Sequence, residues 1–431
     1  MAPDPTTHGF GPLLRRHRIG VGLTQRVLAD LSTISVRTIR DLEQGRARPR
    51  ADTVRLISDA LRLGRQARAD LEQSAGRGAA GRPLGADYDV TLAAPPSVLT
   101  TQVGREAEAG TLVAELTDGA TRLTTVVGPP GVGKTRLAVE VATVLHDRLR
   151  MPVLWLSAPG AGQPVGQPAR DGRLADLLRA ATTALFAAGD GAALGELAEL
   201  VGDRDTLLVV DGVGGVGARP LLGTELLGLL RDCHRLRVLV TADALTGLPG
   251  ERPFLLAPLA MATVDSAEAD TAPAVRLFLD HLRRVRPYHR LTATDTATVV
   301  EICGLLDGLP PALASAASWL TVYDLEPLRD ALFTDPYALL DRAFADRFTD
   351  WVTALPAAQH AMLDRLRDLG EVTMDAAASA TGHTVPEAGQ LLRDLLLRGV
   401  IRLRQTGGQT RFQVLALVAA LDRAEDPALV R

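Results

Sequence analysis

The sequence is poor in several kinds of residue, and each scarcity excludes a class of protein. Its 431 residues include two cysteines, Cys233 and Cys303, too few for a disulfide framework or a CxxC metal site. Aromatic residues make up 3%, which favours helical and α/β cores over an aromatic-rich β-sandwich. No run approaches the roughly 18 apolar residues of a membrane span, and the first residues lack a signal-peptide pattern. We therefore expect a cytoplasmic protein with no membrane partner.

Lysine is the scarcest charged residue, and the charge that is present is unevenly placed. Of 47 Lys and Arg residues only Lys134 is a lysine, which leaves 47 − 1 = 46 arginines. Residues 10–72 contain 13 Arg against 7 Asp and Glu, a balance of 13 − 7 = +6, so the rest of the chain must sum to −4 − 6 = −10. A small basic domain joined to an acidic body predicts that the basic part contacts phosphate backbones.

The lysine lies in a phosphate-loop motif. Residues 128–135 read GPPGVGKT, follow the apolar run Leu123–Val127 and open an expected helix over Arg136–Leu145. The glycines let backbone N–H groups point at phosphate oxygens, and the helix start adds partial positive charge. The residues expected to hold ATP or ADP here are Gly128, Pro129, Gly131, Val132, Gly133, Lys134, Thr135 and Arg136.

A carboxylate at a second strand end completes the predicted site. Four apolar residues, 207–210, precede Asp211, which we expect to hold the Mg²⁺ shell together with the Thr135 hydroxyl. Lys134 and Asp211 are the candidate catalytic residues, with Lys134 bridging the β- and γ-phosphates.

A helix-turn-helix is predicted over residues 23–45. Thr24 is expected to cap a helix that ends at Leu31, and Ser35 a second helix that ends before Gly45. The residues expected to close the core between them are Leu28, Leu31, Ile34, Ile39 and Leu42. The outward-facing residues of the second helix would enter the major groove of double-stranded DNA. The alternative is an ordinary helical bundle with a solvated arginine face.

The organisation predicts a multidomain fold. We expect an all-α helix-turn-helix domain, an α/β P-loop NTPase domain with a parallel sheet, a helical domain and a winged-helix domain. The parallel strands are predicted from short apolar runs separated by helical segments, at Leu123–Val127, Val153–Leu156, Leu207–Val210 and Val238–Val240. Two short runs near residues 400–403 and 410–414 predict a hairpin. The domains are expected at residues 1–75, 101–262, 263–330 and 331–431, with a linker at 76–100.

Residues 10–72 resemble the Cro/repressor-type (XRE) helix-turn-helix family. The resemblance implies that Arg18 and Glu43 form a structural ion pair and that Gln25 touches phosphate. Val36, Arg37 and Asp41 fall where the family reads base edges, and Arg46 and Arg48 where it contacts the backbone. Together with the outward face, the candidate DNA contacts are Gln25, Ser35, Val36, Arg37, Thr38, Arg40, Asp41, Arg46 and Arg48.

Residues 103–322 resemble the nucleotide-binding module of STAND ATPases, which include NB-ARC proteins and antibiotic regulators of Streptomyces. The matching segments beyond the phosphate loop and Asp211 are VGRE at 103–106, VLVT at 238–241, PGE at 249–251, VRLF at 275–278 and GLP at 308–310. The resemblance implies that Val103, Gly104 and Arg105 lie near the adenine and that Pro310 packs over the base. Residues 335–425 resemble the winged helix of the same proteins.

Several positions depart from the family pattern. Gly212 and Val213 stand where a second polar residue often follows the strand aspartate, so no evident base would orient water. Asp243 replaces an arginine that faces the γ-phosphate; it either lies beside the phosphates or points to solvent, with Arg252 substituting. Pro311 replaces a leucine. Hydrolysis is therefore expected to be slow at most. Related proteins often continue into sensor repeats, whereas this sequence ends soon after the expected winged helix.

Three functions follow as hypotheses. The first is a transcription regulator in which ADP favours a closed monomer and ATP favours an open form that self-associates on DNA. The second is a constitutive regulator with a structural, non-hydrolysed nucleotide. The third is an immune or stress-signalling ATPase whose helix-turn-helix binds a partner.

Overall fold

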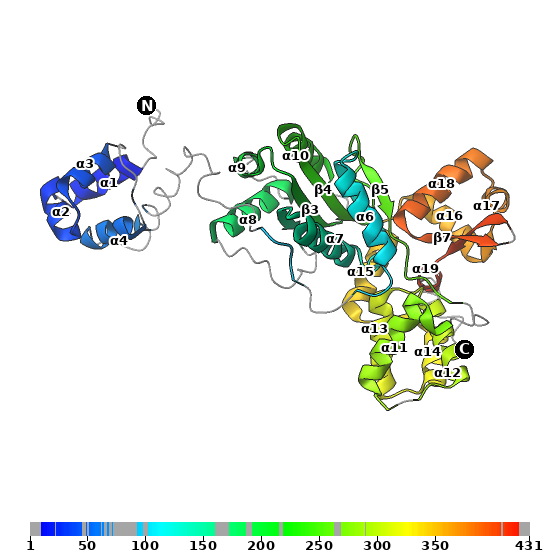
Figure 1. Cartoon of the computed structure of the whole chain (residues 1–431). Helices are drawn as coiled ribbons and strands as arrows, with labels where there is room; N and C mark the ends of the chain where they lie inside the picture. Colours follow the sequence, from blue (N-terminus) through cyan, green and yellow to red (C-terminus); the bar gives the residue numbers. More distant parts are fainter. Residues whose placement is uncertain are drawn as a thin grey trace. The chain divides into compact units, whose positions relative to one another are not determined.

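The structure is a computed structural model in which the chain divides into two units, Met1–Asp87 and Tyr88–Arg431. Figure 1 shows the elements of each unit. The described residues are 10–21, 23–44, 49, 51–61, 63, 67, 68, 71, 93–97, 102–159, 172–186, 192–214, 219–262, 269–288, 290–406 and 408–421. The division between the units falls within the predicted linker 76–100. The other predicted domain boundaries stay predictions.

The first unit is helical. The helices with described bounds are α1 (Phe10–Gly20), α2 (Gln25–Ser32), α3 (Val36–Glu43) and α4 (Ala51–Ala60). Thr24 and Ser35 cap α2 and α3 as predicted, because each side chain accepts a hydrogen bond from the backbone N–H three residues on. Gly11 permits a close crossing of α1 and α3, since a Cβ there would lie 2.7 Å from the carbonyl oxygens of Leu42 and Glu43.

The predicted core of this unit is right except at one position. Leu28, Ile39 and Leu42 are buried and Ile34 is partly buried, but Leu31 is 58% exposed. The reason lies in the helical period: α2 buries Leu28, Ala29 and Ser32, and Leu31 lies about 100° from the centre of that stripe. The expectation that Leu31 closes the core is therefore wrong.

The second unit is built on a parallel five-stranded sheet in the order β2-β3-β4-β1-β5. The strands are β1 (Leu123–Val127), β2 (Val153–Ser157), β3 (Thr206–Val213), β4 (Leu236–Ala242) and β5 (Arg252–Leu255). The first four each contain one of the predicted apolar runs, and β2, β3 and β4 extend beyond it. The fifth, β5, was not predicted because it is a short edge strand, largely exposed, that contains a proline.

Helices cover both faces of the sheet (Figure 1). Alternate residues of β3 point to opposite faces, so Leu207 and Val209 join one core and Leu208 and Val210 the other. The first core takes in α6 (Glu106–Asp118) and α7 (Lys134–Leu149). The second takes in α8 (Gly172–Phe186), α9 (Ala192–Val201) and α10 (Arg219–Asp232).

The rest of the unit is mainly helical. A first group comprises α11 (Pro273–Val285), α12 (Ala293–Leu305), α13 (Pro310–Ser318) and α14 (Leu325–Thr334), with short 3₁₀ turns at Ala269–Thr271, Trp319–Thr321 and Tyr337–Leu339. A second comprises α15 (Arg342–Thr353), α16 (Ala357–Arg367), β6 (Glu371–Val372), α17 (Met374–Thr381), α18 (Val385–Arg398), β7 (Ile401–Thr406), β8 (Gln409–Val414) and α19 (Ala416–Ala420). Strands β7 and β8 pair antiparallel as the predicted hairpin.

These observations confirm the predicted fold class. The chain has an all-helical N-terminal unit, a parallel-sheet α/β domain of the P-loop type and a helical C-terminal region. Helices α16 to α18 with the sheet β6-β8-β7 have the arrangement of a winged helix. The carboxyl ends of the parallel strands meet at one edge of the sheet, which is where such folds bind ligands.

Candidate nucleotide site and helix-turn-helix surface

The phosphate loop connects the buried strand β1 to helix α7. Its glycines supply left-handed backbone, with φ of 80° at Gly131 and 106° at Gly133, values that side chains disfavour. Helix α7 begins at Lys134 and not at Arg136 as predicted, because the helical turn already forms when Leu137 N–H donates to Gly133 O. Lys134 and Thr135 therefore lie in the first turn, whose N–H groups have no partner within the helix.

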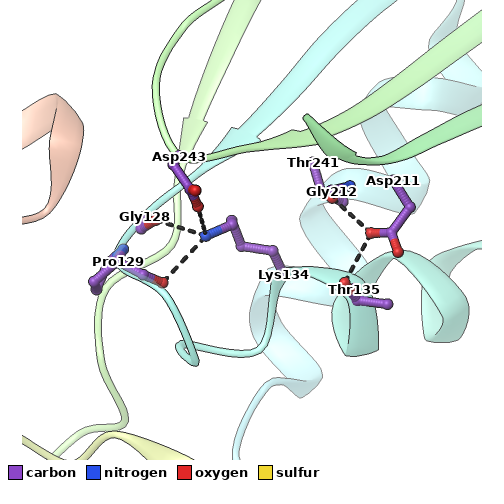
Figure 2. A network of polar contacts seen from close by, with 8 residues as sticks. All are labelled: Gly128, Pro129, Lys134, Thr135, Asp211, Gly212, Thr241 and Asp243. Carbon is purple, nitrogen blue, oxygen red and sulfur yellow. Dashed lines mark hydrogen bonds and ion pairs between the residues drawn. The ribbon is translucent and has the colours of Figure 1, made fainter. Parts of the chain in front are cut away.

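Lys134 is held inside the loop. Its Nζ donates to the carbonyl oxygens of Gly128 at 2.7 Å and Pro129 at 3.1 Å, and to Asp243 Oδ1 at 2.9 Å (Figure 2). The Lys134 side chain is 10% exposed. Asp243, which stands in place of the family's arginine, is therefore paired with the lysine of the loop. The alternative, in which its carboxylate points away into solvent, is not observed.

Asp211 lies at a β-bulge in the pairing of β3 with β4. The register between the two strands shifts between Val210 and Val213, and Gly212 has a φ of 78°. Oδ1 of Asp211 accepts hydrogen bonds from Thr135 at 2.8 Å and from Thr241 at 2.6 Å (Figure 2). Thr241 in turn accepts one from Gly212 N–H at 2.8 Å. The motif pair Thr135–Asp211 is thus brought together as predicted, and Thr241 is an unpredicted third member.

The second carboxylate oxygen of Asp211 supports a cation here. Oδ2 is buried and accepts no hydrogen bond from any residue in the described ranges. Burial raises the pKa of Asp211, although hydrogen bonds from Thr241 and Thr135 and the charge of Lys134 oppose the shift. A hydroxyl and a carboxylate are ligands that Mg²⁺ accepts when phosphates and water supply the rest. The residues present therefore fit Mg²⁺.

The protein alone would not complete that ion's coordination. Among the described residues there is no cluster of three or more His, Cys, Asp or Glu that could hold a metal. Asp211 and Thr135 would supply two oxygen groups, directly or through water, so nucleotide oxygens and water would have to complete the coordination.

The VGRE segment ties the loop to neighbouring elements. Gly104, with a φ of 68°, lies so close to α11 that a Cβ would fall 2.3 Å from the Pro273 side chain. Arg105 is 5% exposed and donates to Ala257 O at 2.6 Å and Val132 O at 3.3 Å. It also pairs with Glu108 at 2.8 Å. The predicted adenine contacts of Val103, Gly104 and Arg105 stay predictions, but Arg105 has a structural role that sequence reasoning missed.

Elements from the C-terminal region lie directly on the phosphate loop. A Cβ on Gly131 would be 2.5 Å from the Pro311 side chain and 2.7 Å from Phe344, which belong to α13 and α15. A Cβ on Gly399 would be 2.5 Å from the Pro129 side chain. Pro310, predicted to pack over the base, starts α13 beside Pro311. Nothing local in the sequence signals these long-range contacts.

Arg252 does not substitute for the missing arginine. It begins β5 beside Thr124, near the start of β1, whereas the loop follows the end of β1. Its guanidinium pairs with Glu115 at 2.7 Å. The neighbouring Glu251, from the PGE segment, accepts hydrogen bonds from the N–H groups of residues 246–248 and so holds a turn. The suggestion of a displaced arginine is therefore wrong for Arg252.

The predicted DNA-reading face of α3 is accessible. Arg37 is 93% exposed and Arg40 is exposed, while Val36, Thr38 and Asp41 are partly exposed. Ser35 is engaged as a cap, accepting from Thr38 N–H at 3.1 Å. The expected ion pair is present: Arg18 donates to Glu43 at 2.5 Å and 3.0 Å. Two predicted phosphate contacts, Arg46 and Arg48, lie outside the described residues.

Gln25 differs from its predicted use. Its side-chain amide donates to Glu43 Oε2 at 2.7 Å and is therefore part of the Arg18–Glu43 network. A phosphate contact from Gln25 would have to use the amide's remaining hydrogen or follow a rearrangement.

Comparisons with known proteins agree with the helix-turn-helix domain predicted at the N-terminus. Residues 10–71 match the model of a helix-turn-helix domain family. An uncharacterized protein of Mycobacterium tuberculosis is 30% identical over 236 residues, 51% of each chain. A second protein of that species, described as a candidate HTH-type transcriptional regulator, is 31% identical over 219 residues, 49% of this chain and 21% of that protein. The chain thus spans about half the length, or less, of these relatives.

Solved structures give only distant likenesses. The Cdc6 protein of Pyrobaculum aerophilum has a TM-score of 0.35 at 14% identity, covering 78% of this chain and 98% of that one. The Orc1 protein of Aeropyrum pernix in complex with DNA has a TM-score of 0.29 at 15% identity, covering 78% and 96%. Similarity this remote says nothing about function.

No helix within the described ranges is long and apolar enough to cross a membrane. The chain carries a helix-turn-helix domain of the matched family, joined to an α/β domain with a phosphate loop.

Proposed function

We propose that this chain is a DNA-binding regulator of transcription that binds ATP or ADP with Mg²⁺. The observation that carries the proposal is the Lys134–Thr135–Asp211 arrangement at the edge of a parallel sheet. The exposed face of α3 in a helix-turn-helix domain supports the DNA-binding half. The resemblance to STAND ATPases, over ordered motifs along residues 103–322, supports the pairing of the two.

The residues assign parts to the bound groups. The backbone N–H groups of the loop and of the first turn of α7 would hold phosphates, with Lys134 as the cation beside them. Asp211 and Thr135 would hold Mg²⁺, which would neutralise phosphate charge. The adenine is assigned to Val103, Gly104, Arg105 and Pro310 on the family resemblance.

Lys134→Ala tests the nucleotide half. We expect it to abolish binding of ADP and ATP, measured by titration calorimetry, because it removes the only lysine and the cation of the loop. Arg148→Ala is the matched control, since it removes an exposed cation from the last turn of the same helix. Equal nucleotide affinity in the wild type and Lys134→Ala would contradict the proposed site.

Arg37→Ala tests the DNA half. We expect the loss of about 1–3 kcal/mol of discrimination at one base position, measured with operator variants selected by the wild type. Arg16→Ala, an exposed arginine on α1, is the control and should leave base preference unchanged. If Arg37→Ala keeps the full sequence preference, α3 is not the reading helix.

Contacts on the loop support control by nucleotide state. Pro311 of α13, Phe344 of α15 and Gly399 at the end of α18 lie against Gly131 and Pro129. A nucleotide that shifts the loop would therefore bear on the same elements, and ADP and ATP could stabilise different arrangements. In the proposal, ATP favours an open, self-associating form whose paired DNA-binding domains gain roughly 10²–10⁴ in avidity. Identical oligomer size and DNA affinity with ADP, ATP and no nucleotide would contradict this.

A specific observation favours a second version, in which the nucleotide is structural and is not turned over. Gly212 carries no side chain and Val213 is buried, so neither can orient a water molecule. Nucleotide retained through purification without release of phosphate would support this version over the switch.

A further inference from the structure

The ammonium of Lys134 is fully engaged within the protein. An ammonium has three N–H donors, and three acceptors surround it: the carbonyl oxygens of Gly128 and Pro129 and the carboxylate of Asp243. Figure 2 shows this cluster as separate from the Thr135–Asp211 pair. A phosphate that binds Lys134 must therefore take the place of at least one of these acceptors.

The position of Asp243 is fixed by the sheet. Strand β4 lies beside β1 with Ala242 opposite Val127, so Asp243 follows β4 at the same level as the first loop residue. Its backbone N–H donates to Val213 O at 3.3 Å. Its Oδ2 lies 3.0 Å from where a Cβ on Gly214 would be, so the carboxylate is confined between Lys134 and residue 214. The close pairing with Lys134 is thus built into the strand order.

A carboxylate at this position affects the binding of a nucleoside diphosphate and of a nucleoside triphosphate differently. A diphosphate can be held by the backbone amides of the loop and by one N–H of Lys134, which gives up a loop carbonyl and keeps its bond to Asp243. A triphosphate brings a further anionic group to the lysine that bridges the β- and γ-phosphates. That group and Asp243 compete for one ammonium and repel each other.

We propose that Asp243 determines the specificity of this site, making it prefer a nucleoside diphosphate over a nucleoside triphosphate by keeping its carboxylate on Lys134. The inference rests on the proposed function, because it presupposes that the loop binds a nucleotide. The Asp243 side chain is 39% exposed, so solvent screens the repulsion. We expect a preference of about tenfold, well below what a buried charge would produce.

The experiment measures the affinities of ADP and of the slowly hydrolysed analogue ATPγS for the full chain, each with Mg²⁺. Asp243→Asn should raise the affinity for ATPγS about tenfold and change that for ADP by less than about threefold. Asp243→Ser, which removes the charge with a smaller side chain, should act in the same direction. Circular dichroism melting confirms that each variant is folded.

Asp205→Asn is the matched control. Asp205 is a similarly exposed aspartate, 44%, that pairs with Arg237 at 2.7 Å just before β3, at the opposite edge of the sheet from the loop. Its loss lowers the negative charge of the same domain and should leave both affinities unchanged. Asp243→Asn and Asp243→Ser could instead change the affinities for ADP and ATPγS equally, or change neither affinity. Asp243 would then not determine specificity, although the loop would still be a nucleotide site. If neither the wild type nor any variant binds ADP or ATPγS, the proposed function is contradicted as well.

Discussion

The Arg18–Glu43 ion pair is a largely buried interaction between helices of the first unit. The Glu43 side chain is 4% exposed and that of Arg18 is 11% exposed, and Gln25 also donates to the same carboxylate. Burial alone would raise the pKa of Glu43, but the hydrogen bonds from Arg18 and Gln25 and the charge of Arg18 outweigh it and lower the pKa. The network connects α1 and α2 to the end of α3, and so positions α3, the helix proposed to read DNA.

Glu43→Ala should destabilise the helix-turn-helix unit by about 2–4 kcal/mol, because it leaves Arg18 without its buried partner. The measurement is the opening free energy from hydrogen exchange at the amides of Leu28 and Ile39 in the full chain. Asp41→Asn, which removes the exposed partner of Arg37 at 3.9 Å, should cost less than about 1 kcal/mol. Equal effects of the two substitutions would show that the buried pair contributes no more than the exposed one.

Glu43 also makes the unit's stability depend on pH. Its pKa is lower in the folded than in the unfolded state, so its contribution is complete above the ordinary glutamate pKa of about 4.3. The contribution is lost as the pH falls below that value and through the folded pKa. We expect the difference in opening free energy between wild type and Glu43→Ala to shrink as the pH is lowered from about 6 to about 3. A difference that stays constant would contradict the lowered pKa.

Residues joined by a local motif could be predicted from the sequence, and residues joined by the fold could not. Lys134 and Thr135 follow from loop spacing, and Asp211 from the rule that parallel strands end at one edge. Pro311, Phe344 and Gly399 reach the loop only through the packing of helices distant in sequence. The ion pair of Asp243 with Lys134 needed the strand order, which places β4 beside β1.

Two turns in the winged-helix region form a matched pair of elements. Gly382 ends α17 and Gly399 ends α18, and both adopt left-handed backbone, with φ of 71° and 79°. Space differs between them: a Cβ on Gly382 would meet nothing within 4 Å, whereas a Cβ on Gly399 would meet Pro129 of the phosphate loop. The same substitution at both sites therefore separates backbone strain from contact with the loop.

Gly382→Ala should cost about 1 kcal/mol, the usual penalty for a side chain in left-handed backbone. Gly399→Ala should cost at least about 1 kcal/mol more, because the turn must also move off Pro129. Urea unfolding followed by tryptophan fluorescence measures both, since all three tryptophans, Trp155, Trp319 and Trp351, lie in the second unit. Hydrogen exchange of loop 128–133 should rise in Gly399→Ala alone. Equal costs and unchanged exchange would indicate that the turn does not bear on the loop.

The elements themselves were largely predictable because each repeats a local pattern. Buried apolar runs gave β1 to β4, and side-chain caps gave the starts of α2 and α3. β5 escaped because an exposed edge strand lacks the apolar run that marks a buried one. Leu31 was misplaced because an apolar residue near a helical stripe need not lie within it.

At the scale of the whole second unit, one buried carboxylate connects segments more than 100 residues apart. Asp307, in left-handed backbone between α12 and α13, is fully buried. Its two oxygens accept from the N–H groups of Ala416 at 2.9 Å and Leu417 at 2.8 Å, so it caps α19. Arg402 of β7 lies 3.6 Å away. Asp307 therefore joins the helical group after the sheet to the end of the winged-helix region.

Burial raises the pKa of Asp307 to about 6, against the opposing effects of Arg402, the two backbone N–H groups and Arg404. A folded pKa above the unfolded value means that the folded state binds the proton more tightly. The contribution of Asp307 to stability is thus largest below the unfolded pKa of about 3.9 and declines as the pH rises through about 6. Above that pH the contribution is constant.

Asp307→Asn removes this titration, and it replaces one of the two acceptors by an amide that cannot accept from α19. We expect a loss of about 1–3 kcal/mol at pH 7.5 in urea unfolding followed by tryptophan fluorescence. The loss should be larger at pH 4.5, where the wild type gains from the bound proton. Asp335→Asn is the control, because Asp335 is exposed and its carboxylate also accepts from two N–H groups, those of Tyr337 and Ala338. Its cost at pH 7.5 should be smaller than that of Asp307→Asn, because water can replace an acceptor lost at an exposed site. A loss in Asp307→Asn that is equal at both pH values would show that Asp307 titrates as an ordinary aspartate and joins the two regions without pH dependence.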